Sequence, residues 1–443
     1  GRSTNIYNAL MYSKDTKDGH EAFVESVFNI NPPKCPADQK ASFEALLTTS
    51  LGEECSMDVV QSVHNEIRER IEMHKEARVA EPLMISKEDV KSVLIVTGKG
   101  SANNRRIVPV EDALNKSGVS YAIFSGVQPN PTIENVEEGV KLYRENNCDC
   151  IIAFGGGSAI DCAKVIGARI AYPKKTVGRL KGLLRIMRKI PTLIAIPTTA
   201  GSGSEVTPAA IITDSQKQHK YALMSFPLIP HYAVLDASLT YSLPQSLTAT
   251  TGMDALTHAV EAYIGRSTTK QTRQLALEAT ALIFENIEKA YIKGNDHLAR
   301  ENLLHASYKA GIAFSKSYVG YIHAISHSVS GIYGTPHGLA NAVIMPYVLE
   351  AYGKSAYKKL HRLGIAAGVC TENDSHKLGA EKFITAIKDT NAKIGIPDKI
   401  TGIKKEDISV MVCYAEREAN PLYPVPRLMT KNQIEALYYQ IGE

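Results

Sequence analysis

The chain has no long apolar segment, no low-complexity tract and no large excess of charge of either sign. No apolar run reaches the ~18–20 residues that a transmembrane helix needs, so we expect no membrane span. The formal net charge of +4 over 443 residues gives no electrostatic support for nucleic-acid binding. What remains is the composition of an ordinary soluble protein, long enough for two or three domains.

The cysteines lack the patterns that disulfides or zinc thiolates require. There are seven, an odd number, scattered along the chain without a Cys-x-x-Cys pair. This distribution argues against a disulfide framework and against a thiolate zinc site. It favours reduced thiols inside a cell, and we therefore expect a cytoplasmic protein.

The pattern of apolar residues predicts three regions, at 1–88, 89–238 and 239–443. The first is polar and carries helical spacing at 41–47 and 58–78, which predicts a helical N-terminal extension. It is either a packed helical cap, which we favour, or an element for docking or oligomerisation.

The second and third regions differ in periodicity. In the second, β-branched runs at 93–97, 121–124, 151–154 and 193–196 alternate with helical stretches, which predicts a doubly wound α/β domain around a parallel sheet. In the third, strand signals nearly vanish and helical patterns cover 272–291 and 300–314. We therefore predict an all-helical second domain, which ends with a short helix at 431–440.

Two loops at the ends of predicted strands favour a dinucleotide site. Gly155, Gly156, Gly157 and Ser158 separate the third strand from a helix predicted at 159–168. Glycines let the backbone approach a ligand, and the helix N-terminus favours an anionic diphosphate. A second loop of hydroxyls and glycines, at 197–204, follows the fourth strand, where a dinucleotide crevice is expected. One such loop alone is weak evidence for a dinucleotide site, but the two loops together predict it.

The spacing of the histidines predicts a metal site in the helical region. Asp254 and His258 are four residues apart, and His323 and His327 repeat that spacing, so each pair shares a helix face. His337 is predicted at the start of a third helix. One carboxylate and three imidazoles suit Fe²⁺ or Zn²⁺ better than Mg²⁺ or Ca²⁺. The alternative is that hydrogen bonds hold these histidines on helix surfaces or in the core.

Five stretches carry a family resemblance: PNP at 129–131, GGGSAIDCAK at 155–164, PTTAGSGSE at 197–205, GMDALTHAVEAY at 252–263 and HAISHSVSGIYGTPHGLAN at 323–341. In these motifs and their order, residues 90–443 resemble the iron-containing, or group III, alcohol dehydrogenases. The resemblance implies an iron-type NAD(P)-dependent alcohol dehydrogenase or aldehyde reductase whose metal ligands are Asp254, His258, His323 and His337.

The resemblance also implies roles for residues around the metal ligands. His327 matches a histidine that lies near the metal and assists proton transfer; its alternative role is to support His323. Lys220 matches a lysine close to the cofactor; its alternative is a solvated charge. The implied cofactor-binding residues are Ser125, Asn130, Gly155, Gly156, Gly157, Ser158, Asp161, Thr198, Thr199, Ser202 and Lys220.

Ser125 bears on the choice of dinucleotide. NAD-preferring relatives tend to carry Asp directly after this second strand, where it bonds the ribose 2′-hydroxyl. Without that carboxylate a 2′-phosphate is not repelled, and Lys99, Arg105 or Arg106 can pair with it. We therefore favour NADP(H) over NAD(H), and Fe²⁺ with Zn²⁺ as the alternative metal.

The implied reaction is hydride transfer between the nicotinamide and a small alcohol with its aldehyde or ketone, because a divalent cation makes the alcohol oxygen acidic. We expect a small-molecule substrate and a homodimer or higher homo-oligomer. Two alternatives stay open: a transhydrogenase between a hydroxy acid and an oxo acid, and a non-catalytic nucleotide-binding component of an assembly. Residues 173–190, with seven Lys or Arg and no acid, are either a solvated helix face or a patch that binds an anion or a partner.

Overall fold

The computed structural model describes residues 90–215 and 219–442, and the helices predicted at 41–47 and 58–78 lie outside them. The described residues divide into two compact units. One holds the residues up to Val93 together with Ile107–Tyr121, and the other holds Leu94–Arg106 and the chain from Ala122 onward. The first unit contains helix α6 (Val108–Lys116), which starts with Pro109 in its first turn and buries Val110, Ala113 and Leu114 at helical spacing.

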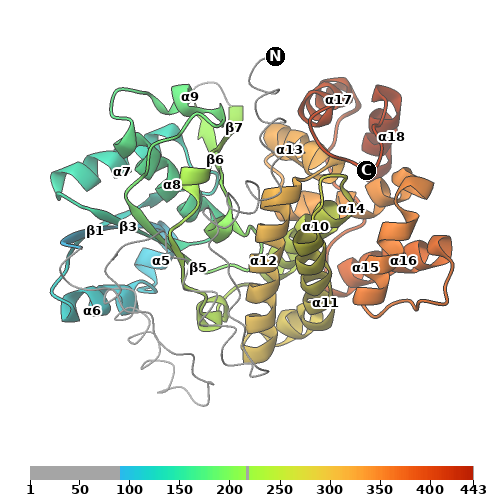
Figure 1. The fold of residues 1–443 in the computed structure, drawn as a ribbon, viewed down its shortest axis with the longest axis horizontal. Helices are drawn as coiled ribbons and strands as arrows, with labels where there is room; N and C mark the ends of the chain where they lie inside the picture. Colours follow the sequence, from blue (N-terminus) through green and yellow to red (C-terminus); the bar gives the residue numbers. More distant parts are fainter. Residues whose placement is uncertain (1–89, 216–218, 443) are drawn as a thin grey trace. The chain divides into compact units, whose positions relative to one another are not determined.

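A five-stranded sheet has the order β2-β1-β3-β5-β8. Its strands β1, β3 and β5 are labelled in Figure 1. All four strands predicted from the sequence are present, and the described pairs β3–β5 and β5–β8 are parallel. Every residue of β3 is buried, as expected for a strand covered on both faces. The strand bounds are β1 Ser92–Gly98, β2 Ser120–Val127, β3 Cys150–Gly155, β5 Thr192–Pro197 and β8 Tyr232–Ala233.

The strand order indicates where on the sheet a ligand would bind. The chain winds from β1 to β2 on one side and to β3 on the other, so the order reverses beside β1. In doubly wound sheets, ligands bind at the carboxyl ends of the strands at such a reversal. Helices α5 (Lys99–Asn103), α7 (Ile133–Glu145) and α8 (Gly157–Ala171) follow β1, β2 and β3. A capping box between Thr132 and Asn135 starts α7.

A second, three-stranded sheet was not predicted. It has the order β4-β7-β6, in which β6 (Ala209–Asp214) and β7 (His219–Met224) are antiparallel. Strand β4 (Gly182–Leu183) lies inside the basic segment 173–190. The prediction of a helix face there was wrong, because only α9 (Val177–Leu180) is helical and the rest forms turns, bends and this strand.

Beyond Ala233 the described residues form no further strand, which confirms the predicted helical region (Figure 1). Helix α10 is buried over most of its circumference and packs against α11, α12 and α14. None of the described helices is long and apolar enough to cross a membrane. The helix bounds are α10 Gln245–Ile264, α11 Lys270–Ile292, α12 His297–Ser317, α13 Tyr321–Tyr333, α14 His337–Tyr352, α15 Tyr357–Ala366, α16 His376–Lys393, α17 Lys405–Ala419 and α18 Lys431–Ile441.

Candidate active site

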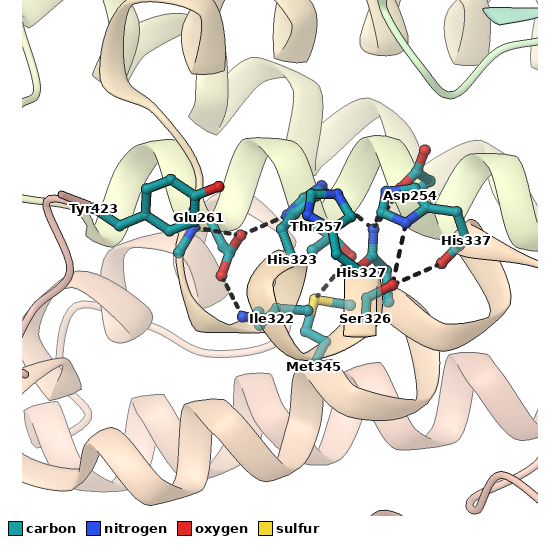
Figure 2. A network of polar contacts seen from close by, with 12 residues as sticks. Asp254, Thr257, Glu261, Ile322, His323, Ser326, His327, His337, Met345 and Tyr423 are labelled. Atoms are coloured by element: carbon teal, nitrogen blue, oxygen red, sulfur yellow. Dashed lines mark hydrogen bonds and ion pairs between the residues drawn. The ribbon is translucent and has the colours of Figure 1, made fainter. Parts of the chain in front are cut away.

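Three helices bring the four predicted metal ligands together. Figure 2 shows three of them, Asp254, His323 and His337. Asp254 and His258 lie on α10 and His323 on α13, and one donor atom from each lies within 4.8 Å of the others. His337 is the first residue of α14, as predicted, and its Nε2 lies 3.7 Å from Asp254 Oδ1. Ligands about 2.1 Å from a tetrahedral metal stand about 3.4 Å apart, so these separations suit a common ion.

The close approach of α14 to α10 depends on the glycine after His337. A Cβ at Gly338 would lie 2.3 Å from the carbonyl oxygen of Thr250 and 3.3 Å from Cβ of Asp254. No other residue type fits such a contact without moving one helix. Gly338 therefore lets His337 reach Asp254.

A buried carboxylate holds His323. Glu261 Oε2 lies 2.6 Å from His323 Nδ1, and the same carboxylate accepts hydrogen bonds from the backbone N–H groups of Gly320 and Ile322, both at 2.8 Å (Figure 2). Because a carboxylate only accepts, the proton of His323 sits on Nδ1 and the lone pair on Nε2. This is the carboxylate–histidine support common behind metal-binding histidines.

Ser326 orients the ring of His337 as Glu261 orients that of His323, with Nε2 toward the other predicted ligands. Ser326 Oγ lies 3.1 Å from His337 Nδ1 and donates to the His337 carbonyl oxygen at 3.3 Å, so it accepts from Nδ1–H. The Nε2 lone pair again faces inward. The amide nitrogen of Asn341 lies 2.7 Å from Asp254 Oδ1, 3.1 Å from His337 Nε2 and 3.3 Å from His323 Nε2. Three lone pairs thus converge on one region, which is the arrangement that a divalent cation needs.

Burial keeps these imidazoles neutral. It lowers the pKa of His337 to about 4 and holds the pKa of His323 well below its usual value. Burial also lowers the pKa of His258, although Asp254 and a hydrogen bond to the backbone of Gly201 act in the opposite direction. Neutral imidazoles can donate their lone pairs at neutral pH without first losing a proton. The donor set therefore fits a borderline divalent metal.

His327 occupies a more open side of the same cluster. Its side chain is 38 % exposed, against 3 % for His323, and its ring stacks on His337 with centroids 5.1 Å apart. Glu418 Oε1, from α17, lies 2.6 Å from His327 Nδ1 and accepts a second hydrogen bond from the Tyr423 hydroxyl at 2.7 Å. Burial opposes the charged form of His327, but Glu418 outweighs it and raises the pKa of His327.

The two glycine-rich loops pack directly on each other. A Cβ at Gly156 would lie 3.1 Å from Thr199 Oγ1, and one at Gly157 would lie 2.8 Å from Ser202 Oγ. Gly156 is also the N-cap of α8 and provides no side chain to cap the helix. Glycine is therefore required at both positions for the two loops to approach each other. The diphosphate site stays a prediction, for which the loops provide hydroxyl groups and a helix N-terminus.

Asp161 has structural partners that the sequence did not indicate. One carboxylate oxygen accepts from Ser204 Oγ at 2.5 Å and the other from the Ile211 backbone at 2.9 Å. The fully buried ammonium of Lys164, one turn along α8, donates to Ser204, Thr207 and Ala209. These bonds tie α8 to the second loop. A cofactor contact by Asp161 stays a prediction.

Lys220 connects the cofactor residues to the histidines. Its Nζ donates to Asn130 Oδ1 at 3.0 Å, and Asn130 has a left-handed backbone with φ of 60°. The Lys220 charge opposes the protonated forms of His327 and His337, although burial is the main reason for the lowered pKa of His337 and Glu418 still raises the pKa of His327. Ser125, in β2, is half-buried. The structure thus places Lys220 beside Asn130, and a cofactor contact by either residue stays a prediction.

Sequence reasoning missed Glu261, Ser326, Asn341 and Glu418. Glu261 and Asn341 lie inside the quoted motifs, and Glu261 is three residues after His258, so the helix period could have placed it beside the cluster. Glu418 has no such signal, because it is 91 residues from His327 and on another helix.

Two family models cover most of the described chain. A model described as "Iron-containing alcohol dehydrogenase" matches residues 68–237, and one described as "Fe-containing alcohol dehydrogenase family, C-terminal" matches residues 248–442. A domain of unknown function also matches residues 1–119.

Named relatives and solved structures agree with these matches. The 1,3-propanediol dehydrogenase of Klebsiella pneumoniae is 35% identical over 79% of this chain and 91% of its own length. The NAD-dependent methanol dehydrogenase of Bacillus methanolicus is 37% identical (72% and 84%), and the NADPH-dependent butanol dehydrogenase of Clostridium saccharobutylicum is 36% identical (69% and 79%). An alcohol dehydrogenase structure from Oenococcus oeni is 32% identical with a TM-score of 0.78, over 88% of this chain and all of that one.

The predicted fold and family are therefore confirmed. The motifs, the order of sheet and helices, and the similarity over most of the relatives' length all agree. This chain belongs to the iron-containing alcohol dehydrogenase family.

Proposed function

We propose that this metal-dependent alcohol oxidoreductase interconverts a small alcohol and its aldehyde or ketone at the histidine cluster, with Asp254, His258, His323 and His337 as the metal ligands. The observation that carries the proposal is the convergence of Asp254 Oδ1, His323 Nε2 and His337 Nε2 on one region, with the opposite nitrogen of each imidazole already bonded. The Asn341 amide lies within hydrogen-bond distance of all three atoms, but its two N–H groups cannot satisfy three acceptors, whereas one divalent cation can.

The chain's own groups divide the work of the reaction. When bound, a divalent cation supplies Lewis acidity and a nicotinamide gives or accepts the hydride. Glu261 and Ser326 keep the imidazole lone pairs directed inward. The neighbouring loops, Gly155–Ser158 and 197–204, would hold the diphosphate, and Lys220 would lie beside the cofactor.

His327 is the group proposed to move the proton. Its Nδ1 is bonded to Glu418, so Nε2 is the ring nitrogen left to face a substrate. The side chain of His327 is 38 % exposed, so it can meet a substrate. Because the proposed ligand His337 is 37 % exposed, the contact with Glu418, and not exposure, sets His327 apart from the ligands. In alcohol oxidation His327 accepts the hydroxyl proton at Nε2, and in aldehyde reduction it returns one.

Of the two dinucleotides, NADP(H) is proposed as the cofactor in preference to NAD(H). Ser125 supplies no carboxylate to repel a 2′-phosphate, and Lys99 and Arg105 are exposed near the carboxyl end of β1. Arg106 is partly buried and its guanidinium donates to the carbonyl of Leu239, so Lys99 and Arg105 are the better partners for the phosphate. Ser125→Asp should lower the ratio of kcat/KM with NADPH to kcat/KM with NADH by about tenfold or more. An unchanged ratio would show that Ser125 does not determine the cofactor preference.

A panel of aldehydes and alcohols tests the function. Protein loaded with Fe²⁺ or Zn²⁺ is assayed with NADH and NADPH, and sustained consumption of free reduced cofactor with a small aldehyde is expected. Turnover that requires a hydroxy acid and an oxo acid together, without net cofactor consumption, would instead favour the transhydrogenase. The panel also compares the two metals, of which Fe²⁺ is proposed.

Two further proposals concern the cellular location of the protein and its oligomeric state. The scattered cysteines, without a Cys-x-x-Cys pair, support a reducing, cytoplasmic location. A homodimer or higher homo-oligomer is expected, and its mass in solution can be measured by light scattering.

A further inference from the structure

Two constraints act on the ring of His327, and they fix different things. The stack on His337, with 18° between the ring planes, sets the plane of the imidazole. A half-turn of the ring about χ2 preserves that plane but exchanges the nitrogen and carbon positions along its edge. The stack alone therefore leaves undecided which ring atoms face the substrate.

Glu418 decides the direction of the ring. Its Oε1 lies 2.6 Å from His327 Nδ1, and a carboxylate can only accept a hydrogen bond. The contact requires Nδ1 on the Glu418 side and a proton on that nitrogen. It leaves the Nε2 lone pair on the other side, and among the described residues no hydrogen bond to His327 Nε2 is formed.

Glu418 is itself held in place. The Tyr423 hydroxyl donates to the same Oε1 at 2.7 Å. Tyr423 follows α17, which carries Glu418, so one segment provides both the acceptor and its support. Nothing in the metal-ligand set contacts this carboxylate in place of His327. The geometry thus separates Glu418 from the groups that bind the metal.

We propose that Glu418 is the positioning residue for His327: it holds Nδ1–H, fixes the tautomer and keeps the Nε2 lone pair directed at the reacting hydroxyl. The inference rests on the proposed proton-transfer role of His327. It predicts that Glu418 affects the rate of the chemical step and leaves the metal site intact. Misdirecting one reacting group lowers the competent fraction of the enzyme by up to about 10²-fold.

Glu418→Ala and Glu418→Gln separate the hydrogen bond from the charge. The Gln amide oxygen can accept from both His327 Nδ1–H and Tyr423, whereas Ala can accept from neither. With zinc-loaded protein we expect Glu418→Ala to lower kcat by about 10–100-fold, with KM and zinc content close to wild type. Glu418→Gln should recover most of the lost kcat. Tyr423→Phe, which removes only the support, should have a smaller effect than Glu418→Ala.

Glu416→Ala is the matched control. Glu416 lies on the same helix, is also partly buried and pairs with Lys431 at 3.2 Å, outside the histidine cluster. Its loss should leave kcat unchanged. A Glu418→Ala protein with wild-type kcat, or one that has lost its zinc, would overturn the proposal. So would a Glu418→Gln protein as slow as Glu418→Ala, because the charge would then matter and not the hydrogen bond.

Crystal structures give a readout that does not depend on turnover. In zinc-loaded wild type, His327 Nδ1 should face Glu418; in Glu418→Ala the ring should turn or take two orientations. A ring that keeps its orientation in Glu418→Ala rejects the positioning role whether or not the enzyme is active. If wild type consumes no reduced cofactor with any aldehyde, the proposed function fails separately, and the ring orientation still decides the role of Glu418.

Discussion

Glu261–His323 and Glu418–His327 are both carboxylate–imidazole pairs joined by 2.6 Å contacts, but their surroundings differ. The side chains of Glu261 and His323 are 1 % and 3 % exposed, whereas those of Glu418 and His327 are 33 % and 38 % exposed. Burial raises the pKa of Glu261 to about 7, while His327 holds the pKa of Glu418 below its usual value despite partial burial.

The difference shows how one chemical pair supports two roles. On the closed side, formed by Glu261 and His323, backbone N–H groups of Gly320 and Ile322 compensate the buried carboxylate, and the pair would hold the proposed metal-binding nitrogen rigidly. On the open side, formed by Glu418 and His327, the carboxylate raises the pKa of His327, which suits a group that accepts a proton at Nε2 and returns it. Metal loss should therefore follow damage to the closed side, and slow chemistry should follow damage to the open side.

Removing the metal should have the largest effect. His258→Ala, or chelation of wild type, should lower kcat by about 10³-fold or more, because Lewis acidity contributes several kcal/mol and each ~1.4 kcal/mol is tenfold. Metal content by mass spectrometry should fall in parallel, and zinc should restore only the chelated wild type. Full activity in metal-free protein would contradict the assignment of metal binding to the closed side.

His327→Ala should come next. Loss of a group that transfers a proton costs about 10²–10⁴-fold in kcat. Because His327 lies on the open side, the metal content should equal that of wild type. A metal-free His327→Ala protein would show instead that His327 belongs to the closed side, as support for His323.

Glu261→Gln should weaken the metal site moderately. The amide oxygen can replace Oε2 and accept from His323 Nδ1–H and the Gly320 N–H, but the NH2 group in place of Oε1 would face the Ile322 N–H, and the negative charge is lost. Zinc affinity, measured by competition with a chromophoric chelator, should fall by about 10–100-fold. With saturating zinc, much of the activity should return. An affinity equal to wild type would contradict the mounting role.

Ser326→Ala should have the smallest effect. It removes one neutral hydrogen bond to His337 Nδ1, worth about 1 kcal/mol, or about fivefold in zinc affinity. The same titration as for Glu261→Gln makes the comparison direct. A loss larger than that of Glu261→Gln would reverse the order expected for neutral and charged supports.

The local pattern of residues along the chain was sufficient to predict much of the fold. The runs at 93–97 and 193–196 predict strands because continuous β-branched residues suit a strand buried on both faces. The antiparallel pair β6–β7 was missed although its residues are just as suitable, because its pairing depends on a partner strand and on the adjoining loop. The basic segment 173–190 was misread for a similar reason, since its conformation comes from pairing with β7 and from Tyr172, whose hydroxyl accepts from the backbone of Met187 and Arg188.

The sequence by itself determined which residues can bind a metal, because the i, i+4 period places Asp254 with His258 on one face of a helix. It could not determine which nitrogen of each imidazole faces inward. That choice belongs to Glu261, Ser326 and Glu418. Each of them lies on another helix than its histidine, so only the tertiary structure brings the partners together. Periodicity acts along one helix, whereas the direction of a hydrogen bond between two helices depends on how they pack.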